Sequence, residues 1–149
     1  MDTNFFGTMQ VVKPTIEQMQ RQGGGNVVII NSLNTHNPWP RTLSYTASKA
    51  ALGAATRSLA TAFGPGNIRA NRLHPGVIFN DSLYITLDDM AKRNGTTRDQ
   101  EVAKITALSP LRQQTTPEDY VGSVLYLLSD MSKPVTGISL HANAGRYMG

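Results

Sequence analysis

The chain has no cysteine among its 149 residues. Disulfides and thiolate chemistry are therefore excluded, and the composition fits a reducing compartment. No apolar run approaches the roughly 18 residues that a membrane-spanning helix needs. The segment from Met1 to Asn4 shows no basic stretch followed by an apolar one, so a secretory signal is not expected. Together these absences predict a cytoplasmic protein.

Charge is sparse and is not clustered. Charged residues make up 16% of the chain, and 14 basic against 10 acidic residues give a formal net charge of +4. The basic residues form no run and are not interleaved with aromatics, so the sequence does not favour nucleic-acid binding, which would show a steep salt dependence. No repeat and no linker divides the sequence. Residues 1–149 are therefore expected to form a single domain.

Helical and strand patterns alternate along the chain, which predicts an α/β fold with a parallel sheet and flanking helices. The strand at residues 26–31 is almost wholly apolar, as is typical of a strand buried on both faces. Pro14 is expected to kink or break the first helix. The expected helices cover residues 4–22, 43–63, about 87–93, about 97–108 and a segment starting at 117; the expected strands cover 26–31, 67–74 and 138–142.

Three consecutive glycines, Gly23 to Gly25, precede the first expected strand. A phosphate-binding loop instead joins the end of a strand to the start of a helix. The glycines are therefore predicted to form a turn. No strand, glycine-rich loop and helix in that order occur anywhere in the chain.

Tyr45 and Lys49 open the long alanine-rich helix expected at residues 43–63. Side chains four residues apart lie one turn apart on the same helix face. A cation within about 4–6 Å of a phenol favours its phenolate and lowers a pKa that is ordinarily near ~10. The pair is thus a candidate for general acid–base chemistry, although such a pair taken alone is also common as a half-buried ring beside a solvated lysine.

With its neighbours, this pair resembles the active-site pattern of the short-chain dehydrogenase/reductase family. Tyr45 and Lys49 match the family's Tyr-x-x-x-Lys pair, and Ser32 lies thirteen residues before Tyr45, where the family places its catalytic serine. Asn4 lies twenty-eight residues before Ser32 and matches the fourth member of the family's tetrad. Three further segments are similar to the family's C-terminal half: Ile68 to Gly76, Ser109 to Asp119, and Leu127 to Gly145.

The resemblance implies a partial Rossmann-like, NAD(P)-binding fold, the C-terminal part of a doubly wound parallel sheet. It implies hydride transfer between a nicotinamide and a small alcohol or ketone. Tyr45 would exchange the substrate proton, and Ser32 would orient the substrate oxygen. Lys49 would lower the tyrosine pKa and hold the nicotinamide ribose, and Asn4 would position a water on the lysine side. The implied cofactor contacts are Tyr45, Lys49, Pro75, Gly76, Val77, Ile78 and Asn80.

The chain departs from the family pattern in several places. The glycine-rich half that binds the dinucleotide pyrophosphate is absent, so the residues that choose NAD or NADP are absent too. Asn80 stands where the family usually has threonine, and Asn143-Ala144-Gly145 replaces its usual acidic-Gly-Gly end. In the family's strand order, the strand at residues 26–31 would have one open, apolar edge, and such an edge promotes association.

Two questions stay open at this level. As an alternative to an enzyme, the chain could be a non-catalytic remnant of the family. Such a remnant would self-associate or pair with a full-length relative through the helices at residues 4–22 and 43–63. A homo-oligomer is expected through the same helices. The segment from residue 80 to 116 is expected to form a pocket lid, and the side chains that line the pocket or belong to the core are Trp39, Leu83, Tyr84 and Leu87.

Overall fold

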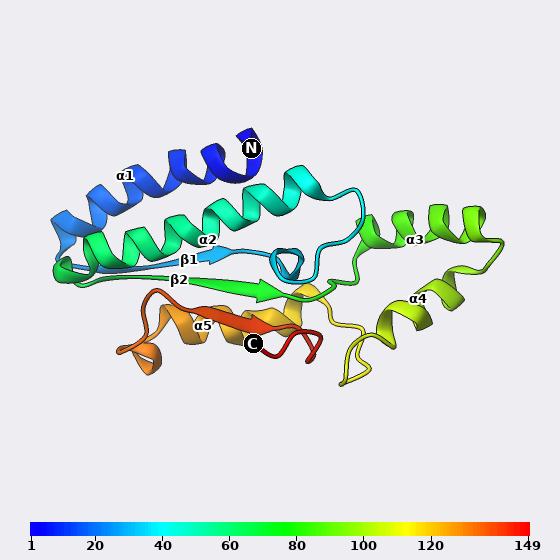
Figure 1. Cartoon of the computed structure of the whole chain (residues 1–149). Coiled ribbons are helices and arrows are strands. Elements are labelled where there is room, and N and C mark those ends of the chain that lie inside the picture. The colour runs from blue at the N-terminus through cyan, green and yellow to red at the C-terminus, as the bar shows by residue number, and fades with distance from the viewer.

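Three parallel strands lie at the centre of the structure, a computed structural model that describes all 149 residues. The strands are β1 (Gly25–Ile30), β2 (Ile68–Pro75) and β3 (Ser139–Ala142), and their order in the sheet is β1-β2-β3. Because all three run in the same direction, the loops that follow β1 and β2 leave the sheet at the same edge (Figure 1). The predicted parallel sheet is confirmed.

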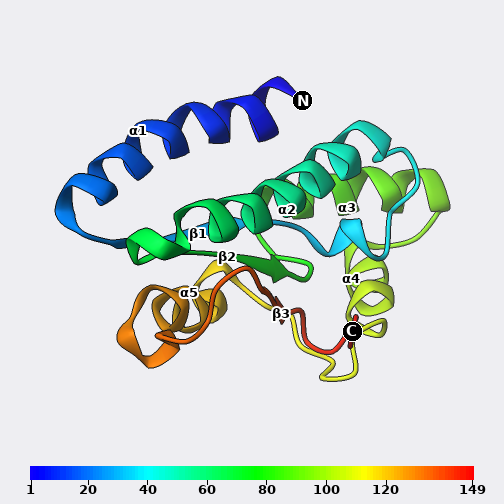
Figure 2. The same cartoon turned by 60° about the vertical axis from the view of Figure 1, so that its left-hand side comes forward.

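Helices cover both faces of this sheet. α1 (Gly7–Gln22) and α2 (Leu43–Phe63) lie on one face, and α5 (Val121–Leu128) lies on the other (Figure 1, Figure 2). A π-helical turn, η1 (Asp2–Phe6), leads into α1, and a 3₁₀ turn, η4 (Pro117–Tyr120), leads into α5. The three layers are those of the expected α/β fold.

α2 packs closely on β2 because its inward face is made of small and apolar residues. Leu52 and Thr56 are fully buried there, and so are Ile68 and Ala70 on the face of β2 that α1 and α2 cover. At Gly53, a Cβ atom would lie 3.1 Å from the Arg72 guanidinium, so only glycine lets the helix come this near without displacing the arginine. The predicted bounds of this helix agree with the observed ones.

α1 is not broken at Pro14, although a kink or break was expected there. The helix continues from Gly7 to Gln22 and ends at Gly23, whose backbone is left-handed. Pro14 and Gln10, four residues earlier, are both exposed. Water can therefore satisfy the Gln10 carbonyl that Pro14 cannot bond, which lowers the cost of a proline in this helix.

β1 differs from its prediction in burial. A strand buried on both faces was expected, but Ile29 is its only buried residue and Ile30 is 46% exposed. β1 is an edge strand, with β2 on one side and no strand on the other. The expectation of an open edge is confirmed, and that open edge is the reason for the low burial.

α3 (Asp81–Asn94) and α4 (Arg98–Thr106) extend beyond the carboxyl ends of the strands (Figure 1). α3 begins earlier than expected because the Asn80 side chain caps it, accepting a hydrogen bond from Leu83 N at 3.0 Å. The two helices share a small core of their own. Its buried members are Phe79, Leu87 and Ile105, with Trp39, Leu83 and Tyr84 packed against them. The side chains considered for a pocket lining therefore belong to this core.

The turn between α3 and α4 is held by a buried carboxylate. Glu101 is 2% exposed and accepts hydrogen bonds from Lys104 Nζ at 2.7 Å, Thr96 Oγ1 at 2.6 Å and Asn94 Nδ2 at 3.3 Å. These hydrogen bonds lower the pKa of Glu101 to about 2, and the bond from Lys104 has the largest effect. The carboxylate is therefore charged at neutral pH and fixes the geometry of this turn.

No helix of the chain has both the length and the apolar character needed to cross a membrane.

Candidate active site

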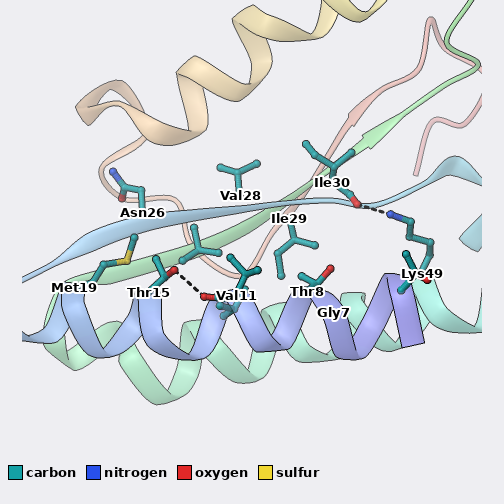
Figure 3. A pocket seen from close by; sticks show the side chains of 13 residues that line it. Gly7, Thr8, Val11, Thr15, Met19, Asn26, Val28, Ile29, Ile30 and Lys49 are labelled. Atoms are coloured by element: carbon teal, nitrogen blue, oxygen red, sulfur yellow. Dashed lines mark hydrogen bonds between the residues drawn. The ribbon is translucent and has the colours of Figure 1, made fainter. Parts of the chain in front are cut away.

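The first turns of α2 meet the end of β1 at the carboxyl edge of the sheet. Lys49 Nζ donates a hydrogen bond to Ile30 O at 2.8 Å, the contact drawn as a dashed line in Figure 3. The same ammonium lies 5.8 Å from the centre of the Tyr45 ring, which is 38% exposed. Burial lowers the pKa of Lys49. A phenol and an ammonium thus lie side by side at an accessible surface, as the four-residue spacing predicted.

Asn31 joins Ser32 to this helix. Its side chain is 2% exposed; Nδ2 donates to Lys49 O at 3.0 Å, and Oδ1 accepts from Ser32 N at 2.8 Å. One buried amide therefore fixes the serine against the helix that carries the tyrosine and the lysine. The sequence pattern did not single out Asn31, because this residue resembles the last residue of an apolar strand. A polar residue directly after such a strand was the available signal.

Ser32 has an extended backbone and caps the short 3₁₀ turn η2 (Leu33–Thr35). Its Oγ accepts a hydrogen bond from Asn34 N at 3.2 Å. A hydroxyl that accepts one bond keeps its own proton to donate elsewhere. The capping role therefore leaves Ser32 able to donate a hydrogen bond to a ligand oxygen.

Asn4 reaches α2 rather than capping its own helix. Its Nδ2 donates to Ser48 Oγ at 3.1 Å, and Ser48 Oγ in turn donates to Tyr45 O at 2.6 Å. Ser48 is 1% exposed, so this relay is internal. The structure brings Asn4 to Ser48, the residue beside Lys49, a contact that no sequence pattern had indicated.

The segment after β2 is braced from two sides. Gly76 N donates to Ala142 O at 3.1 Å, and Val77 O accepts from Thr115 Oγ1 at 2.7 Å. A Cβ atom at Gly76 would lie 3.0 Å from the Cα of Asn143, so the glycine is needed for this close approach. Pro75 ends β2, and Ile78 lines an apolar cavity of about 290 Å³ against α5. Asn80 follows as the cap of α3, with its Oδ1 already engaged.

Known proteins match this arrangement over nearly the whole chain. A family model described as enoyl-(acyl carrier protein) reductase matches residues 1–146. L-rhamnose 1-dehydrogenase (NAD(P)(+)) of Azotobacter vinelandii is 32% identical, over 98% of this chain and 54% of its own length. Carbonyl reductase [NADPH] 2 of Sus scrofa is 31% identical, over 97% of this chain and 56% of its own.

The chain belongs to the short-chain dehydrogenase/reductase family. The solved L-sorbose reductase of Gluconobacter frateurii, a complex with NADPH and L-sorbose, has the same fold with a TM-score of 0.90 at 22% identity, over 98% of this chain and 56% of that one. Membership supports oxidoreduction with a nicotinamide cofactor as the general chemistry of the family. The predicted family and the Rossmann-type fold are therefore confirmed.

This short-chain dehydrogenase/reductase chain spans about half the length of the curated relatives it matches. Along the unpaired edge of β1, a groove of about 630 Å³ separates the strand from α1. Figure 3 shows Val11, Thr15 and Met19 of α1 on one side of this groove and Ile29 of β1 turned toward them from the other. The groove ends at Lys49. The site thus opens directly onto the free edge of the sheet.

Proposed function

We propose that this chain carries the substrate and nicotinamide side of an NAD(P)-dependent oxidoreductase site acting on a small alcohol or ketone. The observation that supports the proposal is the Asn31 amide, which fixes Ser32 to the helix bearing Tyr45 and Lys49. Family membership supports the reaction class. The small-molecule substrate and its site residues stay predictions.

The proton chemistry follows from the side chains. Tyr45 is the proton donor to a carbonyl oxygen in reduction and the acceptor in oxidation. The Lys49 ammonium lies 5.8 Å from the centre of the Tyr45 ring, so a positive charge stands beside the group that exchanges the proton. Ser32 donates a hydrogen bond to the same oxygen and stabilises the charge that develops there. Asn4, through its bond to Ser48, would hold a water on the lysine side.

The residues present fit one end of a dinucleotide. Lys49 has three donors and uses one on Ile30 O, so two are free for the ribose hydroxyls of NAD or NADP. Pro75, Gly76, Val77, Ile78 and Asn80 would line the nicotinamide side. When bound, the nicotinamide supplies or accepts the hydride. The chain contributes no strand, glycine-rich loop and helix for the pyrophosphate, so we expect its own affinity for the cofactor to be low.

A second candidate is a binding role, in which this chain pairs with a copy of itself or with a full-length relative. It is favoured by the free edge of β1 and by exposed apolar residues beside it, including Val11 of α1 and Ile30 of β1. Pairing through α1 and α2 would follow the expected homo-oligomer. Absence of nicotinamide binding by a folded chain would favour this role.

Turnover tests the leading proposal. Purified chain would be incubated with NADPH or NADH and a panel of ketones and sugars, and loss of reduced nicotinamide would be followed. We expect Tyr45→Phe to lower the rate by about 10²–10⁴-fold, the usual contribution of a general acid or base. The matched control is Tyr126→Phe on α5, outside the site. Equal rates for the wild type and Tyr45→Phe would refute the assignment.

A further inference from the structure

All three histidines of the chain come together in space, although they lie far apart in sequence. One ring nitrogen of each of His36, His74 and His141 lies within 4.8 Å of the corresponding nitrogens of the other two. The ring centres are separated by 5.1 Å between His36 and His74, 5.0 Å between His36 and His141, and 4.8 Å between His74 and His141. Their spacing in the sequence is not typical of a metal site. They become neighbours only because the fold brings them together.

The backbone fixes this meeting. His74 and His141 are register partners on the neighbouring strands β2 and β3, so both rings project from the same face of the sheet. His36 follows the turn η2 and donates its backbone N–H to Leu33 O at 2.9 Å. Its ring stacks on Tyr147 at a centroid distance of 4.1 Å. A strand pair and a capped turn therefore hold the three imidazoles.

Two buried ring nitrogens have no partner. His74 is 2% exposed; its Nδ1 lies 3.1 Å from Ser32 O, a carbonyl that can only accept, so Nδ1 carries the proton. His74 Nε2 then carries a lone pair and is buried without a hydrogen bond. His141 Nδ1 is also buried and has no hydrogen-bond partner. An unpaired buried polar atom is costly. A histidine whose other nitrogen donates to a carbonyl has the usual arrangement of a metal ligand.

The surrounding charges keep the rings neutral. Burial lowers the pKa of all three histidines, and Arg72 lowers each of them further. A neutral imidazole is the form that coordinates a metal. The Arg72 guanidinium lines the same cavity as His36 and His74 and donates hydrogen bonds to Ser139 Oγ at 2.6 Å and to the Gly53 carbonyl. Its positive charge opposes a divalent cation, so the affinity should be below that of a site with a carboxylate ligand.

We propose that His36, His74 and His141 form a binding site for one divalent transition-metal ion of the Zn²⁺ class. Three histidines and an open fourth position are a known zinc ligand set. With Zn–N bonds of about 2.0–2.1 Å, tetrahedral ligand nitrogens lie roughly 3.4 Å apart. On binding, the rings would have to rotate about their side-chain bonds to close the difference from 4.8 Å. A small polar cavity of about 160 Å³ adjoins His36 and His74.

The bound ion would join the loop after β1 to β2 and β3. Ser32 precedes η2 and accepts from His74 through its carbonyl, so the metal would stiffen the segment that carries the candidate catalytic serine. This site does not rest on the proposed oxidoreductase function. It uses none of Tyr45, Lys49 or Asn4.

The test is titration of tag-free, chelator-treated chain with ZnCl₂ in a calorimeter, and with CoCl₂ in a visible spectrometer. We expect one ion per chain and a Co²⁺ spectrum of tetrahedral type. His36→Ala and His141→Ala should each weaken binding by at least about 10-fold. These two residues are less buried than His74, so the variants should fold. The matched control is Asn37→Ala in the same loop, which should bind like the wild type.

NMR of the histidine rings adds a measurement that needs no variant. The chain has no other histidine, so every histidine ring signal belongs to the proposed site. All three signals should shift together when ZnCl₂ is added, because all three rings would bind the ion. Absence of a heat signal, or binding that is equal in wild type, His36→Ala and His141→Ala, would overturn the proposal. Shifts confined to one ring would overturn it as well.

Discussion

Asn31→Ala should both destabilise the chain and loosen the candidate site. The substitution removes two buried hydrogen bonds, from Nδ2 to Lys49 O and from Ser32 N to Oδ1. A net value of about 0.5–1.5 kcal/mol for each bond gives about 1–3 kcal/mol. The Ser32 N–H is left without its partner at a partly buried position, which adds about 1 kcal/mol. The expected loss is therefore about 2–4 kcal/mol of unfolding free energy.

Urea unfolding followed by the fluorescence of Trp39, the only tryptophan, measures this loss. For a chain of this size the same change lowers Tm by roughly 5–15 °C. Asn37→Ala is the control, because the exposed Asn37 side chain makes one hydrogen bond, to Arg146 O at 3.2 Å. That variant should lose less than about 1 kcal/mol. Equal stability of the two variants would refute the view that Asn31 fastens the site to α2.

Three further predictions concern the frame around the site. Gly76→Ala should destabilise the chain by about 1–3 kcal/mol in urea, because the added methyl meets the Asn143 backbone at 3.0–3.3 Å; an unchanged midpoint would show that this contact is loose. In metal-free chain, burial and the neighbouring His141, Arg72 and His36 lower the pKa of His74 to about 4, so the unfolded chain protonates first. The contribution of His74 to the free energy of unfolding should therefore be fully present above about pH 6.5 and decrease by at most about 3 kcal/mol towards pH 4. Acid titrations should show a smaller decrease for His74→Gln. An identical decrease in that variant would contradict the assignment. Ile30→Lys on the open edge of β1 should lower self-association in sedimentation velocity, and a wild-type chain that sediments as a single monomer would refute the edge argument.

Local rules predicted most of the elements. The long helix at residues 43–63 was predictable because alanine and leucine favour helix throughout, and Gly64-Pro65-Gly66 follows it. Alternation of helices and strands predicted the layers, and the Tyr45–Lys49 spacing predicted a side-by-side pair. These features depend on residues close together in the chain.

Several features that depend on distant residues did not follow from local patterns. The apolar pattern of β1 suggested burial on both faces, whereas its open edge was expected only from the strand order of the family, and the low burial follows from that edge. Asn31 owes its role to Lys49, eighteen residues later, which becomes its neighbour only when α2 packs on the sheet. The histidine cluster depends on the register of β2 with β3, which no sequence spacing reveals.

The most direct test of the proposed site is a titration of the chain with NADPH and with NADH, followed by nicotinamide fluorescence. Wild type and Tyr45→Phe would be compared with Lys49→Met, which removes the ammonium proposed to hold the ribose while keeping a side chain of similar length. We predict weak, saturable binding to the wild type. Lys49→Met should weaken it at least about 10-fold, the loss of more than ~1.4 kcal/mol expected for a charged hydrogen bond, and Tyr45→Phe should weaken it less than Lys49→Met does. No binding by a folded wild-type chain, or equal binding by Lys49→Met, would contradict the account.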